Sequence, residues 1–306
     1  MNPITALLVA LGGLTAVFAA AWAKAVASAR KRRDTAPNPA TDARFPTATQ
    51  IGVGAITNFF DTLGIGSFAT TTALFRLWKL VPDRIIPGTL NAGHTLPTVV
   101  QAFLFTAIIS VDVLTLFSMI GAAILGAWLG AGVVSGWPRR RVQLGMGAAL
   151  LAAATLMLMT QLNLFPGGGE APGVRGSRLA IAIGGNFLLG ALMTLGIGLY
   201  APCMILVSLL GMNPRAAFPI MMGSCAFLMP VGSLRFIREE SYNLRSALGL
   251  ALGGIPGVLL AFYVVTELPI VAIRWLVIVV VVYTAVTLLM AGAKETKEEA
   301  IAPARS

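Results

Sequence analysis

The chain has 306 residues, of which 57% are hydrophobic and only 11% are charged. Soluble domains carry about 25% charged residues, so this chain has too little charge to cover a water-facing surface. Its formal net charge of +10 would point to nucleic acid in a soluble protein, but here Lys and Arg gather in short loops between apolar runs, where they orient membrane spans. Composition therefore predicts an all-α polytopic membrane protein that contacts the lipid bilayer and no nucleic acid.

Apolar runs follow one another along the whole chain. They lie near residues 5–29, 46–80, 85–111, 113–135, 141–162, 178–210, 216–237, 245–265 and 268–291. A helix that crosses a bilayer needs roughly 20 apolar residues, which most of these runs supply. The first run lacks a basic start and is followed by the basic sequence RKRR, so we expect a first transmembrane helix and not a signal peptide.

An internal repeat divides the remainder of the chain. At an offset of 132 residues, the sequence TLGIGSFA (Thr62–Ala69) aligns with TLGIGLYA (Thr194–Ala201), and two downstream prolines align with two others without a gap. Two related halves are expected from such self-similarity. The predicted units are an N-terminal helix with a basic cytoplasmic loop (1–45), a first transmembrane repeat (46–162), an extracytoplasmic Gly/Pro-rich loop (163–177), a second transmembrane repeat (178–291) and a cytoplasmic tail (292–306).

The positive charges test how these runs cross the membrane. If all nine runs cross once, the basic loop at 24–44 and the cluster Arg139–Arg141 fall on opposite sides, against the positive-inside rule. The conflict disappears if run 46–80 turns back at Gly64–Gly66 as a re-entrant helical hairpin, and run 178–210 does so from the other face. The two halves are then inverted repeats with helix breaks, an arrangement of secondary transporters that places substrate near the midplane. Nine or ten plain crossings with long tilted helices are the alternative.

The helix breaks and the polar segment after each are the predicted substrate site. A half-helix that begins inside a membrane protein presents free N–H groups and a positive dipole end, which favour an anion. Hydroxyl, amide and imidazole groups in the first half, and hydroxyl and thiol groups in the second, add further donors, although glycines in a membrane helix also serve close packing alone. The predicted substrate-binding residues are Gly64, Gly66, Ser67, Thr70, Thr71, Thr89, Asn91, His94, Thr95, Gly196, Gly198, Tyr200, Cys203 and Ser224.

Two ionisable residues are candidates for coupling to a proton or another cation. Asp61 precedes the first break, and His94 is the single histidine of the chain. An ionisable residue within a membrane span predicts function by default. The alternatives are that Asp61 caps backbone N–H groups or pairs with a basic residue, and that His94 is a neutral histidine hydrogen-bonded between helices. We expect no enzyme, metal or cofactor, because one histidine and two separated cysteines do not match metal-site spacing and no phosphate loop occurs.

The segments GIGSFATTTALF and PDRIIPGTLNAGHTLPTVVQAF, with GIGLYAPCMILVSLLGMNPRAAFPIMMGSCAFLMP in the second half, resemble the TauE/SafE sulfite exporter family of membrane permeases, also called TSUP. Members typically have a glycine-rich break, a downstream proline and a Gly-Thr-Ser-like patch in each half. The positions that match are Gly64, Gly66, Pro87 and residues 89–95, and then Gly196, Gly198, Pro202, Pro219 and Gly223–Ser224. The first half departs from the pattern, with Thr70 in place of a proline and Gly-His-Thr in place of Gly-Thr-Ser.

The resemblance implies a secondary transporter that exports small sulfur-containing anions, such as sulfite or organosulfonates, by alternating access driven by an ion gradient. We expect a multi-pass protein of the cell (plasma or inner) membrane, whose C-terminus the positive charges at Lys294 and Lys297 place in the cytoplasm, and a homo-oligomer is a further expected partner state. A permease for a carboxylate anion, an ion channel with two re-entrant pore loops and a membrane scaffold without transport remain alternatives.

Overall fold

The computed structural model describes residues 3–31, 38–63, 66–105, 111–164, 168–196, 198–213, 216–264 and 270–301. Within these ranges the regular elements are helices, and the only β-type pairing is an isolated bridge between Ala171 and Met212. Six of the helices, α1, α5, α6, α7, α9 and α10, are long and apolar enough to cross a membrane. The protein is an all-α polytopic membrane protein, as composition predicts.

Eleven α-helices occur in the described part of the chain, together with two short 3₁₀ turns at Pro39–Thr41 and Asp83–Ile85. The α-helices are α1 (Pro3–Lys31), α2 (Ala48–Thr62), α3 (Ser67–Leu77), α4 (Ile86–Phe105), α5 (Val113–Val134), α6 (Arg139–Gln161), α7 (Gly176–Met193), α8 (Tyr200–Leu209), α9 (Ala217–Arg238), α10 (Leu244–Val264) and α11 (Ile270–Ile301).

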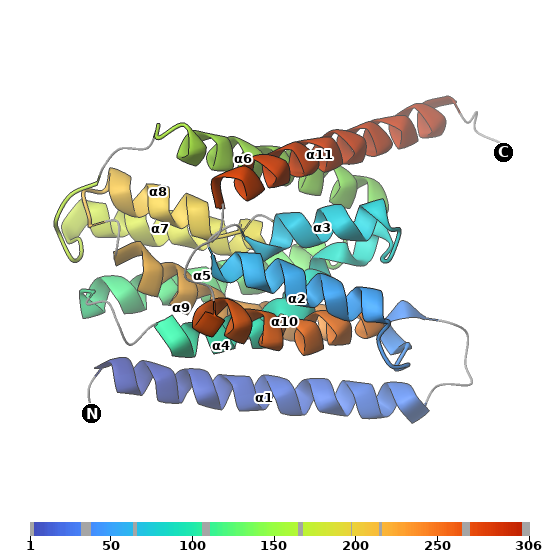
Figure 1. Cartoon of the computed structure of the whole chain (residues 1–306), viewed down its shortest axis with the longest axis horizontal. Helices are drawn as coiled ribbons and strands as arrows, with labels where there is room; N and C mark the ends of the chain where they lie inside the picture. The colour runs from blue at the N-terminus through green and yellow to red at the C-terminus, as the bar shows by residue number, and fades with distance from the viewer. Residues whose placement is uncertain are drawn as a thin grey trace.

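Both long runs that were expected to break are broken. Run 46–80 forms α2 and α3, and run 178–210 forms α7 and α8. At 11 and 10 residues, α3 and α8 are far shorter than the roughly 20 residues that span a bilayer. In Figure 1 the outer ends of α2 and α3 both lie on the right, whereas the outer ends of α7 and α8 both lie on the left. Each pair therefore turns back on itself, and the two pairs do so from opposite ends of the molecule.

Helix packing repeats between the sets α2–α6 and α7–α11. Helix α2 packs against α10 and α7 against α5; α4 packs against α10 and α9 against α5; α3 packs against α11 and α8 against α6. Helices α4 and α9 pack against each other, as do α6 and α11. If each helix is exchanged for the helix at the same place in the other set (α2 for α7, α3 for α8 and so on), the first six contacts are exchanged in pairs. The contacts α4–α9 and α6–α11 are left unchanged by the same exchange. Moved along by the 132-residue offset, α3, α4 and α5 begin and end within two residues of α8, α9 and α10.

Glycines allow the closest of these helix pairs to form. A Cβ at Gly190 of α7 would collide with the carbonyl oxygen of Ala123 in α5. At the related α2–α10 contact, a Cβ at Gly253 would collide with the carbonyl oxygen of Ile51. Small residues at such positions bring helix backbones together in membranes, where packing replaces the hydrophobic effect as the driving force. Helix α1 lies outside this arrangement, against α4 and α9 (Figure 1).

Candidate functional site

A cavity of about 310 Å³ lies where the two helix breaks meet. Most of its walls come from the first break, the start of α8, one face of α6 and one face of α9, and α4 and the end of α7 add one residue each. The described lining residues are Asp61, Thr62, Leu63, Gly66, Ser67, Phe68, Ala69, Thr98, Ala153, Leu156, Met157, Thr160, Met193, Gly198, Leu199, Tyr200, Pro202, Met204, Met221, Met222 and Cys225. Five predicted site residues are among them: Asp61, Gly66, Ser67, Gly198 and Tyr200.

At the first break, the carboxylate of Asp61 lies at the start of α3, where an anion would otherwise bind. Gly66 precedes α3 with φ +89°, a backbone conformation that residues with a side chain rarely adopt. The backbone N–H of Ser67 then donates to Asp61 Oδ1 over 2.6 Å, so the carboxylate occupies the capping position of α3. This is the backbone-capping alternative for Asp61. Gly64, the other glycine predicted at this break, lies outside the described residues.

The second break has no such carboxylate. Gly196 turns the chain after α7 with φ +99°, and α8 begins at Tyr200. The residue that matches Asp61 in the repeat register is Met193, which cannot accept a hydrogen bond in the way a carboxylate does. The start of α8 lines the cavity through Gly198, Leu199 and Tyr200. The two breaks therefore differ in charge although they match in sequence around their glycines.

A chain of hydrogen bonds connects the two breaks through Gln101 of α4. The hydroxyl of Tyr200 donates to Gln101 Oε1 over 3.0 Å. Gln101 Nε2 donates to Asp61 Oδ2 over 3.0 Å and to the hydroxyl oxygen of Thr62 over 2.9 Å. Gln101 is fully buried, so these contacts satisfy an amide that has no access to water. Gln101 is not among the predicted site residues, although its position as a polar residue inside the apolar run 85–111 could have indicated it.

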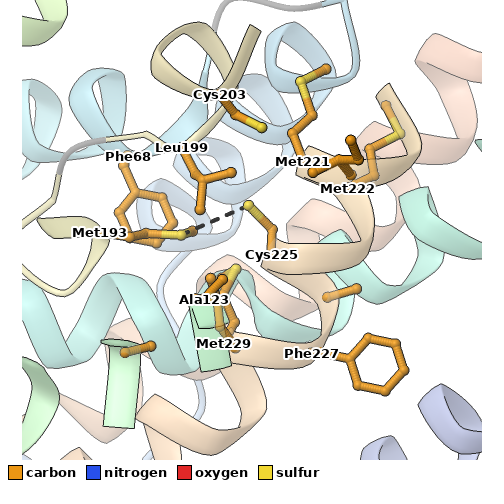
Figure 2. Close-up of a cluster of buried hydrophobic side chains, with 14 of the residues drawn as sticks. Phe68, Ala123, Met193, Leu199, Cys203, Met221, Met222, Cys225, Phe227 and Met229 are labelled. Atoms are coloured by element: carbon orange, nitrogen blue, oxygen red, sulfur yellow. Dashed lines mark hydrogen bonds between the residues drawn. The ribbon is translucent and has the colours of Figure 1, made fainter. Parts of the chain in front are cut away.

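Sulfur-containing side chains form much of the remaining wall. Cys225 Sγ lies 3.7 Å from Met193 Sδ, and Figure 2 shows Met221 and Met222 on α9 a turn before Cys225. Met157 of α6 and Met204 of α8 also line the cavity. Methionine is flexible and polarizable, which lets it fit ligands of irregular shape. An apolar residue that faces a cavity cannot be distinguished by type from one in the core, so the sequence held no signal for this wall.

His94 lies outside the cavity wall, between helices. Its Nε2 is 3.0 Å from the hydroxyl oxygen of Thr71 in α3, and its Nδ1 is 3.1 Å from Asn58 Oδ1 in α2. The ring of Phe68 lies over it with centroids 5.6 Å apart, and the imidazole is fully buried. Both ring nitrogens thus have partners in the protein. This geometry matches the alternative of a neutral histidine bonded between helices.

The other predicted site residues are also placed away from the wall. Thr89 and Thr95 of α4 donate to the carbonyls of Ile85 and Asn91, four residues earlier in the chain, and Asn91 donates to the Pro87 carbonyl. These local bonds are a common way for a polar side chain to be satisfied inside an apolar helix. The predicted residues that do not line the cavity are Thr70, Thr71, Thr89, Asn91, His94, Thr95, Gly196, Cys203 and Ser224.

The charge of the cavity comes from one residue. Asp61 is the only Asp, Glu, Lys, Arg or His among the described lining residues. An anion in this cavity therefore has a carboxylate as a neighbour and needs a compensating positive charge. No group of three or more His, Cys, Asp and Glu in the described part of the chain is arranged to hold a metal ion.

An ion pair outside the membrane-spanning segments joins the loop before α7 to the start of α5. Asp112 caps α5 by accepting from the backbone N–H of Thr115 over 2.8 Å, and Arg175 donates to both of its carboxylate oxygens. Hydrogen bonding to Arg175 holds the pKa of Asp112 well below its usual range, and Thr115 adds to this effect. Asp112 therefore stays ionised at physiological pH.

No protein-family model, curated protein or solved structure gives a match to the chain.

Proposed function

We propose that this protein is a secondary transporter and that its substrate passes through the cavity between the two helix breaks. The main support for this proposal is that both breaks, which lie in separate halves of the chain, line one cavity of about 310 Å³. Broken helices that meet near the middle of a membrane protein are where transporters bind their substrates. Backbone at such a break needs a partner, which protein, water or ligand can supply.

Two further observations support inverted repeats and alternating access. The pairs α2–α3 and α7–α8 turn back from opposite ends of the molecule (Figure 1), and the helix contacts of one half recur in the other. In this proposal the end that carries Arg139–Arg141 faces the cytoplasm, in line with the positive-inside rule. The C-terminus is then cytoplasmic, and the protein resides in the plasma or inner membrane.

The proposed substrate is a small sulfur-containing anion such as sulfite or an organosulfonate, moved outward, with a carboxylate anion as the alternative. This class rests on the resemblance to the TauE/SafE family. The start of α8 supports an anion because no carboxylate takes the place that Asp61 has at α3. Because Asp61 lines the same cavity, the anion travels with a positive charge, and we assign that charge to a proton on Asp61 or a cation beside it.

Flux measurements in vesicles test this proposal. The purified protein is reconstituted in liposomes, and uptake of labelled sulfite, thiosulfate, a short alkanesulfonate and a carboxylate is measured with and without an imposed pH gradient. We expect saturable uptake of one of these anions that rises with the gradient. Leucine in place of Gly198 should abolish it, because the larger side chain would fill the cavity.

The matched control is Thr155→Val, which removes a hydroxyl from an exposed position on α6 whose bond is to its own helix. This variant should transport like the parent. Currents that rise linearly with voltage and never saturate would identify a channel. Absence of flux for every anion tested, from protein that is folded, would contradict an anion transporter.

A further inference from the structure

We infer that Gln101 is a positioning residue that couples a proton on Asp61 to the orientation of the Tyr200 hydroxyl. With Asp61 ionised, the Tyr200 hydrogen is held by Gln101; with Asp61 protonated, it is released toward the cavity, where it can donate to an anion. The inference rests on the proposed function and deepens it, because it says how a proton and an anion would bind together.

The hydrogen bonds around Asp61 are those of a carboxylate. Oδ1 accepts from the Ser67 backbone N–H and Oδ2 accepts from Gln101 Nε2. An ionised carboxyl group only accepts hydrogen bonds, whereas a protonated one must also donate. Both oxygens therefore have partners that suit the charged form, whereas a proton on Oδ2 would face the N–H of Gln101.

The orientation of the Gln101 amide follows from its three neighbours. Its NH₂ group donates to Asp61 and to Thr62, and its oxygen accepts from Tyr200. The Thr62 hydroxyl hydrogen is already directed to the carbonyl of Asn58, over 2.8 Å, so Thr62 can only accept from Gln101. Reversing the amide while Asp61 is ionised would place the amide oxygen against two acceptors.

A proton on Asp61 Oδ2 reverses this preference. The new O–H needs an acceptor, while Gln101 presents only N–H hydrogens to it. If the amide rotates, its oxygen accepts from Asp61 and from the Thr62 hydroxyl, whose hydrogen turns away from the Asn58 carbonyl. The NH₂ group then faces Tyr200, which has to accept instead of donate. If the amide moves away, Tyr200 loses its acceptor. In either case the phenol hydrogen is free, and Tyr200 already lines the cavity.

The other titratable groups near Asp61 do not replace it in this role. Tyr200 and Cys203 on α8 and Cys225 on α9 are neutral donors at physiological pH. His94 on α4 is held by Thr71 and Asn58, Arg76 on α3 is paired with Asp83, and Arg245 on α10 donates to the Phe45 carbonyl. The other charged or titratable side chains on elements packed against α2 and the cavity lie at helix ends or are exposed: Tyr263 on α10, Arg139–Arg141 at the start of α6, Arg178 near the start of α7, and Arg235 and Arg238 at the end of α9.

Infrared difference spectroscopy between about pH 5 and about pH 9 tests the inference without any substrate. The parent protein should show a carboxylic acid C=O band that Asp61→Asn removes, and a tyrosine ring band shift that Tyr200→Phe removes. The acid band and the tyrosine band shift should both change with pH, and the two titrations should have the same midpoint. Asp61→Asn should also abolish the tyrosine shift, whereas Tyr200→Phe should retain the Asp61 band.

If Gln101 has this positioning role, its removal should separate the Tyr200 band shift from the protonation of Asp61. In Gln101→Met, which keeps the side-chain length but cannot bond, the Asp61 band should still appear while the Tyr200 shift no longer follows it. Thr160→Val, which removes another hydroxyl from the cavity wall whose bond is to its own helix, should leave both signals unchanged.

Three results would overturn the inference: a Tyr200 shift that still follows pH in Gln101→Met, a Tyr200 shift whose midpoint in the parent differs from that of Asp61, or no Asp61 band over this range. The second and third need no Gln101 variant, so they apply even if that variant does not fold. Failure of the flux assay alone would leave these spectra unchanged and would count against the proposed transport function, not against the coupling of Asp61, Gln101 and Tyr200.

Discussion

Asp61 and Ser67 lie on either side of the first helix break, and the carboxylate of Asp61 accepts a 2.6 Å hydrogen bond from the backbone N–H of Ser67. The start of α3 is thereby capped within the chain. An anionic substrate that approached this helix end would meet a carboxylate already in place, whereas the start of α8 has no such group. The two breaks are thus expected to contribute differently to binding.

This cap should contribute measurably to stability. Asp61→Ala removes the acceptor for Ser67 and for Gln101, and loss of an N-terminal cap costs about 0.5–2 kcal/mol. Asp61→Asn keeps one acceptor oxygen and should cost less. Thermal unfolding of the purified variants in detergent measures the difference. Equal losses for the two variants would show that the hydrogen bond to Ser67 has no part in holding α3.

Replacing His94 should weaken the fold and leave ligand recognition intact. His94→Ala leaves Thr71 and Asn58 without their partner, and each buried polar group left unsatisfied costs about 1–3 kcal/mol. We expect a lower unfolding temperature, but the same increase in that temperature on addition of whichever anion the flux assay identifies. A variant of full stability in which the ligand effect is lost would place His94 in the binding site instead.

Two glycines on α7 should respond in opposite ways to the same substitution. Gly190→Ala would drive a Cβ into Ala123 of α5, so it should lower stability and disturb the α5–α7 contact. Gly184→Ala meets nothing within 4 Å and should stabilise α7 by up to about 1 kcal/mol through its helix propensity. The unfolding temperatures of the two variants, each compared with that of the parent protein, test this prediction. Similar losses at both positions would contradict the close approach of the two helices.

The pH dependence of the Asp112–Arg175 pair has a defined sign. Because Arg175 lowers the pKa of Asp112 in the folded protein, the resulting stability is fully present above the ordinary Asp pKa of about 3.9. It is lost as the pH falls from there through the lower folded pKa. Asp112→Asn keeps an α5 cap but removes the charge, so it should be less stable than the parent by a constant amount from about pH 8 to about pH 5.

Unfolding temperatures of the two proteins measured across this range, and down to about pH 3, test the sign. The difference between the two unfolding temperatures should become smaller only at the acidic end of the range. A gap that widens on acidification would mean that the folded protein raises the pKa of Asp112 instead.

Much of the fold could be predicted from the sequence because its main signals are local and repeated. Long apolar runs with few charges predict membrane helices, and the positions of the basic loops conflict with single crossings but agree with turned-back segments. The glycines at 66 and 196 do adopt positive φ, as a chain reversal between helices requires. The packing of α2 against α10 and of α5 against α7 could not be predicted from local sequence, because it depends on which glycine of one helix faces the backbone of the other.

The site was harder to predict, because polarity inside a membrane helix has two causes. Thr89, Asn91 and Thr95 look like a binding patch in one dimension, but each bonds to a carbonyl four residues back. Gln101 is one polar residue among apolar neighbours, yet it joins both breaks. What separates the two cases is the direction of the side chain across the fold, which neither residue type nor spacing along one helix specifies.

The sulfur-rich wall gives the cavity a chemical vulnerability. Met157, Met204, Met221 and Met222 line it as apolar, deformable side chains. Oxidation of a methionine adds a polar oxygen and turns the side chain into a stiffer hydrogen-bond acceptor, which an apolar wall cannot satisfy. Oxidation of these side chains would therefore make an apolar wall polar, and methionine sulfoxide reductases would be needed to restore it.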